Sequence, residues 1–227
     1  MTTAAPHSND SPAVGTSTRR HFVLATGVVA AGLVVGLAFA RRNDERSGLA
    51  GSSGASGEPF VPNAFLRIAP DDNITVVIGK SEMGQGIYTG LAMIIAEELD
   101  VAPQRIQVEF APVDPAYNSP FLPAQFTGGS TSTNSSYEQL RKAGATARTM
   151  LLAAAAQEWG VDVSSLTTSD GVVQSGDGRR RASYGSLATA AANLAAPAEV
   201  TLKAPADFRY LGKPQRRLDS PAKVDGS

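Results

Sequence analysis

The chain has 227 residues, of which 42% are hydrophobic and 18% charged, enough for one domain with a substantial core and at most a second small lobe. Its 20 basic and 21 acidic residues nearly balance, so charge gives no reason to expect a nucleic-acid partner. The sequence has no cysteine, which excludes disulfides, thiolate zinc sites, iron–sulfur ligation and thiol nucleophiles. Its two histidines, His7 and His21, lie near the amino terminus. We therefore expect that no side chain holds a metal and that the chemistry depends on a bound group.

The amino-terminal segment has the order of a twin-arginine export signal. Arg19 and Arg20 are followed by Phe22 and by an uncharged, apolar stretch over residues 23–40. This stretch ends in a small-x-small cleavage pattern, although the two arginines directly after it make cleavage less certain. Its 18 residues lie at the lower limit for crossing a bilayer core, so an uncleaved signal anchor is the competing interpretation. Cleavage and anchoring stay open, with a buried cytoplasmic helix as a third alternative. We predict a signal or anchor over residues 1–40, which implies a periplasmic or periplasm-facing protein that residues 23–40 could attach to the membrane.

Residues 41–58 are rich in Gly, Ser and charge and predict a flexible linker, so the folded part begins near Pro59. Alternating apolar residues and a turn sequence predict a β-hairpin over residues 65–68 and 73–78. Helical spacing predicts a helix over residues 87–99, and a half-buried strand follows at 105–112. The acidic residues at the end of this helix are expected to be solvated.

A second, longer helix is predicted over residues 135–159. Ser135 and Glu138 fit a capping box at its start, and Gly160 fits a left-handed cap at its end. Beyond it the pattern predicts a hairpin over 172–174 and 181–183 with an arginine-rich exposed tip, then a helix over 184–194 and a short strand over 200–202. The expected fold class is α+β, with small mixed sheets and packed helices.

Two polar loops that contain glycine stand directly before the two longer predicted helices: the first loop covers residues 82–86 and the second loop covers residues 127–134. Glycine lets the backbone approach a ligand closely, and the amide groups at a helix amino end favour an anion. The side chains there add a carboxamide and several hydroxyls without negative charge. Each loop alone also fits simple helix capping, and neither is a P-loop or a dinucleotide fingerprint. The candidate cofactor-binding residues are Met83, Gly84, Gln85, Gly86, Gly128, Gly129, Ser130, Thr131, Ser132 and Thr133.

Several segments together resemble the molybdopterin-binding subunit of the xanthine dehydrogenase and aldehyde oxidase superfamily, in the branch of the isoquinoline 1-oxidoreductase beta subunit. The resemblance covers residues 61–227 and rests on Glu-Met-Gly-Gln-Gly-Ile-Tyr-Thr-Gly at 82–90, Ala-Glu-Glu-Leu at 96–99, Phe-Thr-Gly-Gly-Ser-Thr-Ser-Thr at 126–133, Leu-Arg-Lys-Ala-Gly-Ala at 140–145, Tyr-Leu-Gly-Lys-Pro at 210–214 and Arg-Leu-Asp-Ser-Pro-Ala-Lys-Val-Asp-Gly at 217–226. The combination is more specific than either loop.

The resemblance implies a molybdenum hydroxylase that oxidises aldehydes or N-heterocycles with water-derived oxygen. It implies molybdenum-molybdopterin in the cytosine dinucleotide form, with contacts from residues 84–86 and 128–133. It also implies a small partner subunit that holds [2Fe-2S] clusters, which fits the lack of cysteine here.

Members of this family are several times longer and carry a third glycine-rich loop and a late catalytic glutamate. We therefore expect residues 59–227 to be a partial molybdopterin-binding domain, and we assign no catalytic residue, Glu82 included. Two alternatives remain: an exported module that binds an anionic ligand without redox activity, and a nonfunctional fragment.

Overall fold

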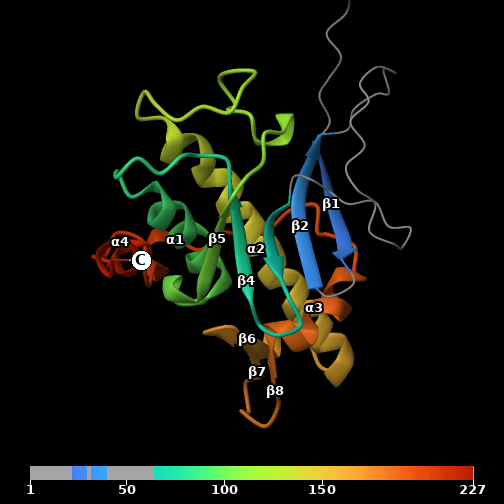
Figure 1. The fold of residues 1–227 in the computed structure, drawn as a ribbon. Helices are drawn as coiled ribbons and strands as arrows, with labels where there is room; N and C mark the ends of the chain where they lie inside the picture. Colours follow the sequence, from blue (N-terminus) through green and yellow to red (C-terminus); the bar gives the residue numbers. More distant parts are fainter. Residues whose placement is uncertain (1–21, 30–31, 40–63, 227) are drawn as a thin grey trace, which may run out of the picture.

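The computed structural model describes residues 22–29, 32–39 and 64–226. It has the expected α+β architecture, with two sheets and packed helices (Figure 1). The larger sheet has five strands in sequential order. Its strands are β1 (Phe22–Val29), β2 (Gly32–Phe39), β3 (Ala64–Ile68), β4 (Ile74–Ile78) and β5 (Ile106–Phe110). Neighbouring strands are antiparallel except for β4 and β5, which are parallel.

The parallel pair is joined by helix α1 (Ile87–Leu99), so β4, α1 and β5 form one crossover unit. The hairpin of β3 and β4, the helix and the strand β5 confirm the predictions for residues 65–110. Leu91 and Ile95 of α1 are completely or almost completely buried, as the helical spacing requires. The carboxyl ends of β4 and β5 lie at one edge of the sheet, where the first polar loop begins.

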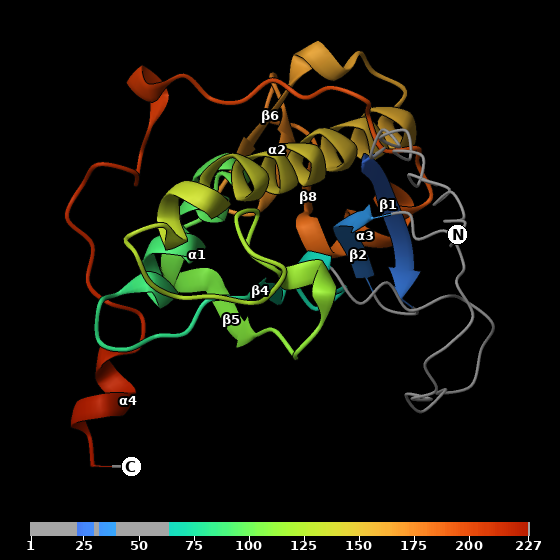
Figure 2. The same ribbon diagram turned by 90° about the horizontal axis from the view of Figure 1, so that it is seen from above.

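Helix α2 (Ser132–Trp159) packs along α1 behind the sheet (Figure 2). It starts three residues before the predicted position, so the capping box is wrong: Ser135 Oγ donates to the Ser132 carbonyl, and Glu138 pairs with Lys142 instead. The predicted end is confirmed, because Gly160 is left-handed (φ 64°) and its N–H bonds the Ala156 carbonyl.

The acidic end of α1 is buried, which contradicts the expected solvation. Glu98 is fully buried against α2, where Arg141 Nη2 lies 2.6 Å from its carboxylate. Glu97 is also fully buried, and Lys203 Nζ lies 3.1 Å from it. Buried carboxylates of this kind persist only where cations and amide groups compensate them. The partners come from distant parts of the chain, so the local sequence does not reveal them.

The second sheet consists of β6 (Leu166–Ser169), β7 (Val172–Ser175) and β8 (Arg181–Ser183). It confirms the predicted hairpin with its exposed tip and adds β6, which was not predicted. Two helices follow, α3 (Tyr184–Ala192) and α4 (Ser220–Val224). The strand predicted over residues 200–202 is wrong, because this segment pairs with no strand. Directly after it, the backbone N–H of Lys203 donates to the Glu98 carboxylate. Short 3-10 turns lie at Pro103–Arg105, Pro115–Tyr117, Val163–Ser165 and Pro205–Asp207.

Most of the apolar stretch predicted as a signal or anchor lies in β1 and β2, which form a hairpin next to β3. The interpretation of residues 1–40 as an export signal or anchor stays a prediction. The predicted linker at 41–58 lies outside the described residues. Within the part that the structure describes, no helix is both long and apolar enough to cross a bilayer.

Candidate functional site

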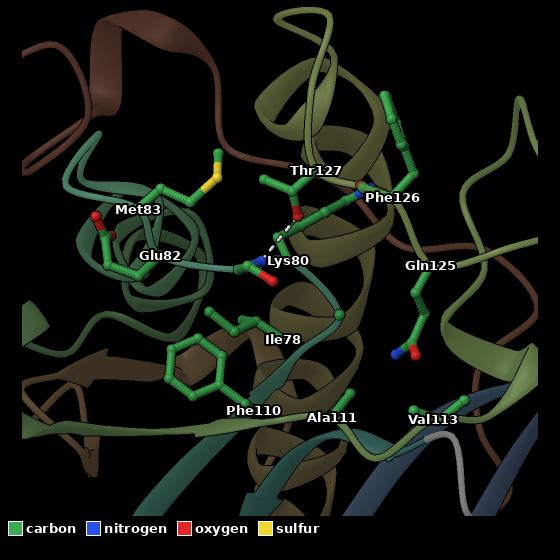
Figure 3. Close-up of a pocket in the computed structure, with 12 residues that line it drawn as sticks. Ile78, Lys80, Glu82, Met83, Phe110, Ala111, Val113, Gln125, Phe126 and Thr127 are labelled. Carbon is green, nitrogen blue, oxygen red and sulfur yellow. Dashed lines mark hydrogen bonds between the residues drawn. The ribbon is translucent and has the colours of Figure 1, made fainter.

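An open cavity of about 560 Å³ lies at the carboxyl ends of β4 and β5 (Figure 3). In open α/β units this edge is the usual place for a ligand, and small-molecule sites have volumes of roughly 300–1,000 Å³. The cavity is lined by both polar loops and by the ends of the two strands. Its lining residues are Ile78, Gly79, Lys80, Ser81, Glu82, Met83, Phe110, Ala111, Val113, Gln125, Phe126 and Thr127.

Two hydrogen bonds join the first loop to the chain entering the second. Lys80 Nζ donates to the Phe126 carbonyl at 3.1 Å, and the Ser81 N–H donates to Thr127 Oγ1 at 2.8 Å, the bond drawn in Figure 3. Gly79 permits the close approach of this region, since a Cβ there would lie 2.9 Å from Tyr117 Cβ. The structure therefore brings together two loops that lie more than 40 residues apart, as the sequence predicted.

The amino end of α1 is occupied by a carboxylate of the protein itself. Glu82 accepts the N–H groups of Gly84, Gly86 and Tyr88 at 2.8 to 2.9 Å. Burial raises the pKa of Glu82, but these amide groups and the charge of Arg217 outweigh it and hold the pKa below its usual value. The three amides are thus committed to Glu82, which acts as the cap of this helix.

Gln85 supports the shape of the first loop from within. Its Nε2 donates to the Ser81 carbonyl at 2.9 Å, and its Oε1 accepts the Met83 N–H at 2.5 Å. Gly84 and Gly86 have φ values of 99° and 87°, in the region that favours glycine. The Met83 side chain is 68% exposed and is the one predicted residue of this loop that lines the cavity.

The second loop leaves the amino end of α2 uncapped. Thr131 Oγ1 bonds back to the Gly128 carbonyl, and Ser130 takes a left-handed φ of 56°. No side chain of the described residues caps α2, and none of the hydrogen bonds within the described part uses the N–H groups of residues 132–134. Free amides at the start of a 28-residue helix favour an anion or an electronegative group. Of the two helix ends considered in the sequence, α2 is therefore the one open to a ligand.

Lys80 adds a positive charge close to this end. It is only 6% exposed, and burial lowers its pKa. Besides the cavity, it lines a small pocket beside Ser135 and Ser136 in the first turns of α2. In the described part of the chain, no carboxylate lies within salt-bridge distance of Lys80. A buried ammonium beside the positive end of a helix is electrostatically unfavourable unless an anion compensates both.

The predicted and observed site residues therefore differ in part. Met83 lines the cavity, whereas Gly84, Gln85 and Gly86 shape the first loop without lining the cavity. Residues 128–133 do not line it either; they form the turn before α2 and the first residues of that helix. The candidate residues named from the sequence did not include Lys80 and Thr127, which line the cavity. Their positions could have identified them, because each stands next to a glycine at the start of a polar loop: Lys80 follows Gly79, and Thr127 precedes Gly128.

The comparison with family models places the chain in a class of cofactor-binding domains. The model of the molybdopterin cofactor-binding domain matches residues 18–223, so the chain belongs to this family. This confirms the resemblance noted in the sequence.

Relatives agree with this family. The chain is 30% identical over 243 aligned residues to isoquinoline 1-oxidoreductase subunit beta of Brevundimonas diminuta, covering 92% of this chain and 30% of that protein. It is 31% identical to a membrane-bound aldehyde dehydrogenase (pyrroloquinoline-quinone) of Gluconacetobacter polyoxogenes, covering 74% of this chain and 22% of the relative. Among solved structures, a Cu,Mo-CO dehydrogenase matches 55% of this chain and 15% of its own with 25% identity and a TM-score of 0.45. The chain thus spans about a third or less of these relatives.

Proposed function

We propose that the protein is part of a molybdenum hydroxylase subunit that oxidises aldehydes or N-heterocycles with water-derived oxygen. Membership of the molybdopterin cofactor-binding family supports the cofactor in this proposal. The names of two relatives support the substrate classes, since one names isoquinoline, an N-heterocycle, and the other an aldehyde. When bound, the molybdenum centre would supply the oxygen transfer and take up the electrons of the substrate. The observation that carries the proposal is the cavity between two joined loops in a chain of this family.

Lys80, which lines the cavity, and the uncapped amino end of α2 offer donors that fit an anionic pterin. In this proposal the free amides of residues 132–134 and the ammonium of Lys80 hold the negatively charged phosphate end of the cofactor. Ser130 and Thr131 add hydroxyls at the turn, and Met83 covers the pterin from the first loop. Gly84, Gln85 and Gly86 give the first loop the shape that presents Met83 to the cavity, and Glu82 holds that shape.

The cytosine dinucleotide form of the cofactor, a small [2Fe-2S] partner subunit and a periplasmic or periplasm-facing location belong to the same proposal. The partner would accept the electrons, since this chain has no cysteine to ligate a cluster. The order of residues 18–40 supports twin-arginine export, a route for proteins that are already folded with their cofactor.

Lys80→Met tests the proposal in the full-length protein purified with its partner. The substitution keeps the apolar stem of the side chain and removes the charge. Because a hydrogen bond to a charged group typically contributes about 1.5–3 kcal/mol, we expect retention of pterin and molybdenum under dilution to weaken by about 10- to 100-fold. Metal analysis and the fluorescence of oxidised pterin measure it. Lys213→Met is the matched control, because Lys213 is exposed and its side chain makes no hydrogen bond or ion pair in the described part.

Two outcomes would contradict the proposal. A correctly folded wild-type complex without molybdenum or pterin would overturn it, and stable binding of simple phosphorylated ligands by that preparation would favour the anion-binding module. Equal cofactor retention in the Lys80→Met and Lys213→Met variants would show that Lys80 does not bind the cofactor.

A further inference from the structure

The carboxyl-terminal segment over residues 203–219, here called the strap, runs past α2 and down along α1 to α4 (Figure 2). It contains little regular structure beyond the 3-10 turn at Pro205–Asp207. Its order must therefore come from side-chain contacts. Most of those contacts lie at the two ends of α1, and Arg141 of α2 adds a hydrogen bond to the Lys203 carbonyl.

The first anchor is Glu97, at the carboxyl end of α1. Its buried carboxylate accepts the backbone N–H groups of Arg209, Tyr210 and Leu211 at 2.7 to 3.0 Å, and Lys203 Nζ lies 3.1 Å away. Three consecutive amides around one carboxylate form a concave anion-binding arrangement of the backbone. The middle of the strap is thereby fixed to α1.

The second anchor lies at the amino end of α1, next to the cavity. The Leu218 N–H donates to Thr89 Oγ1 at 3.0 Å. Arg217 donates from Nη1 to the Gly84 carbonyl at 2.7 Å and from Nη2 to Glu82 Oε1 at 3.1 Å. Asp219 holds the guanidinium in place through Nε and Nη2, at 3.0 and 2.8 Å.

The contact with Glu82 links Arg217 to the conformation of the first loop. Glu82 is the carboxylate that also receives the amides of Gly84, Gly86 and Tyr88. Gly84 is bonded from both sides, through its N–H to Glu82 and through its carbonyl to Arg217. The loop itself is exposed at Met83, Gly84 and Gln85. Its order thus depends on polar contacts, since it has little buried apolar surface of its own.

We propose that Arg217 is a positioning residue: acting from the strap, it locks residues 82–86 in the shape that lines the cofactor cavity. The guanidinium suits this task because its planar fork holds several N–H donors in a fixed geometry that serves a carboxylate and a carbonyl at once, whereas a lysine presents a single point charge without that geometry. The effect on the cofactor rests on the proposed function above, whereas the effect on loop order does not.

The experiment compares Arg217→Ala, Arg217→Lys and Arg216→Ala in the full-length protein with its partner. Arg216 is the matched control, because it is the adjacent arginine, is exposed and makes no side-chain hydrogen bond or ion pair among the described residues. Two readouts are taken: amide hydrogen exchange at residues 84–88 in protein made without molybdopterin, and the pterin content of protein made with it.

We expect exchange at residues 84–88 to accelerate by about tenfold or more in Arg217→Ala and by about threefold in Arg217→Lys, with Arg216→Ala unchanged. Exchange in β4, represented by Val76, should stay constant, which separates loop release from general destabilisation. If Arg217→Ala does not fold, the threefold change confined to the loop in Arg217→Lys still supports the proposal, and an unchanged loop in that variant overturns it.

The two readouts distinguish the two proposals. Unchanged exchange in folded Arg217→Ala would overturn the positioning role. Faster exchange together with reduced pterin content supports both proposals. Faster exchange with pterin content equal to that of Arg216→Ala supports the positioning role and contradicts the assignment of this loop to the cofactor.

Discussion

At the scale of single residues, Glu98 and Gly144 explain how two long helices approach each other so closely. Glu98 is fully buried between α1 and α2, and Arg141 Nε donates to it at 2.7 Å. Gly144 faces it, and a Cβ there would lie 2.8 Å from Glu98 Cβ and 3.1 Å from the Ile95 carbonyl. The interface between α1 and α2 therefore depends on the small size of Gly144 and on the ion pair of Glu98 with Arg141, in addition to apolar packing.

Two of the helical glycines, Gly144 and Gly90, give a matched pair of substitutions with opposite expected signs. Gly144→Ala overpacks the interface and should lower the free energy of unfolding by about 1–3 kcal/mol. Gly90→Ala in α1 meets no atom within 4 Å, so its better helix propensity should raise the free energy of unfolding by about 0.5–1 kcal/mol. Urea titration of both variants checks the signs. A neutral or stabilising Gly144→Ala would contradict the described packing of α1 on α2.

Sequence reasoning was least successful for individual charged residues. It expected Glu97 and Glu98, at the carboxyl end of the predicted helix, to be solvated, because acidic residues at that end do not stabilise a helix. Their compensating groups lie at Arg141 and Lys203, more than 40 and 100 residues away. Helical spacing alone does not show which charge a later segment will cover.

At the scale of elements, α1 organises both ends of the strap and the first loop. Sequence periodicity predicted α1 and the strands on either side of it, since each has a regular apolar pattern and a turn or proline beside it. It misplaced the start of α2, because residues 132–134 are polar and resemble a loop although they form its first turn. The position of the strap could not be predicted from the sequence either, because backbone amides of residues 209–211 bond to Glu97, a carboxylate more than 100 residues away.

The attachment of the strap should weaken in acid. Burial raises the pKa of Glu97, but the amides of residues 209–211 and Lys203 outweigh it and hold the pKa below its usual value of 4.5. The unfolded chain therefore binds more protons at this carboxyl group than the folded one, so the stabilisation is complete above about pH 4.5 and is lost as the pH falls through the folded pKa.

Amide exchange at Tyr210 and Leu211, corrected for the intrinsic effect of pH, measures this release. Protection should decrease below about pH 4.5 in the wild type and already be reduced at pH 7 in Glu97→Gln. Glu158→Gln is the control, because Glu158 is an exposed residue of α2 whose side chain makes no hydrogen bond or ion pair in the described part. Equal protection in the wild type and Glu97→Gln at pH 7 would show that Glu97 does not hold the strap.

At the scale of the whole molecule, the crossover unit of β4, α1 and β5 places the two polar loops at one edge of the sheet, with α2 supplying a free amino end (Figure 1). The sequence predicted that the loops would act together, from their glycines and from the family resemblance. It did not separate their roles. One loop is capped by Glu82, and the other is left open near Lys80.

The central claim is that the cavity between these loops receives molybdopterin. The most direct measurement is the position of molybdenum and pterin in a structure of the full-length protein loaded with cofactor, with the metal located by its anomalous scattering. We predict that the pterin lies in the cavity, with its phosphate end within hydrogen-bond distance of Lys80 Nζ and the amides of residues 132–134. A cofactor bound elsewhere, with Lys80 and these amides facing only solvent or other protein groups, would contradict the claim.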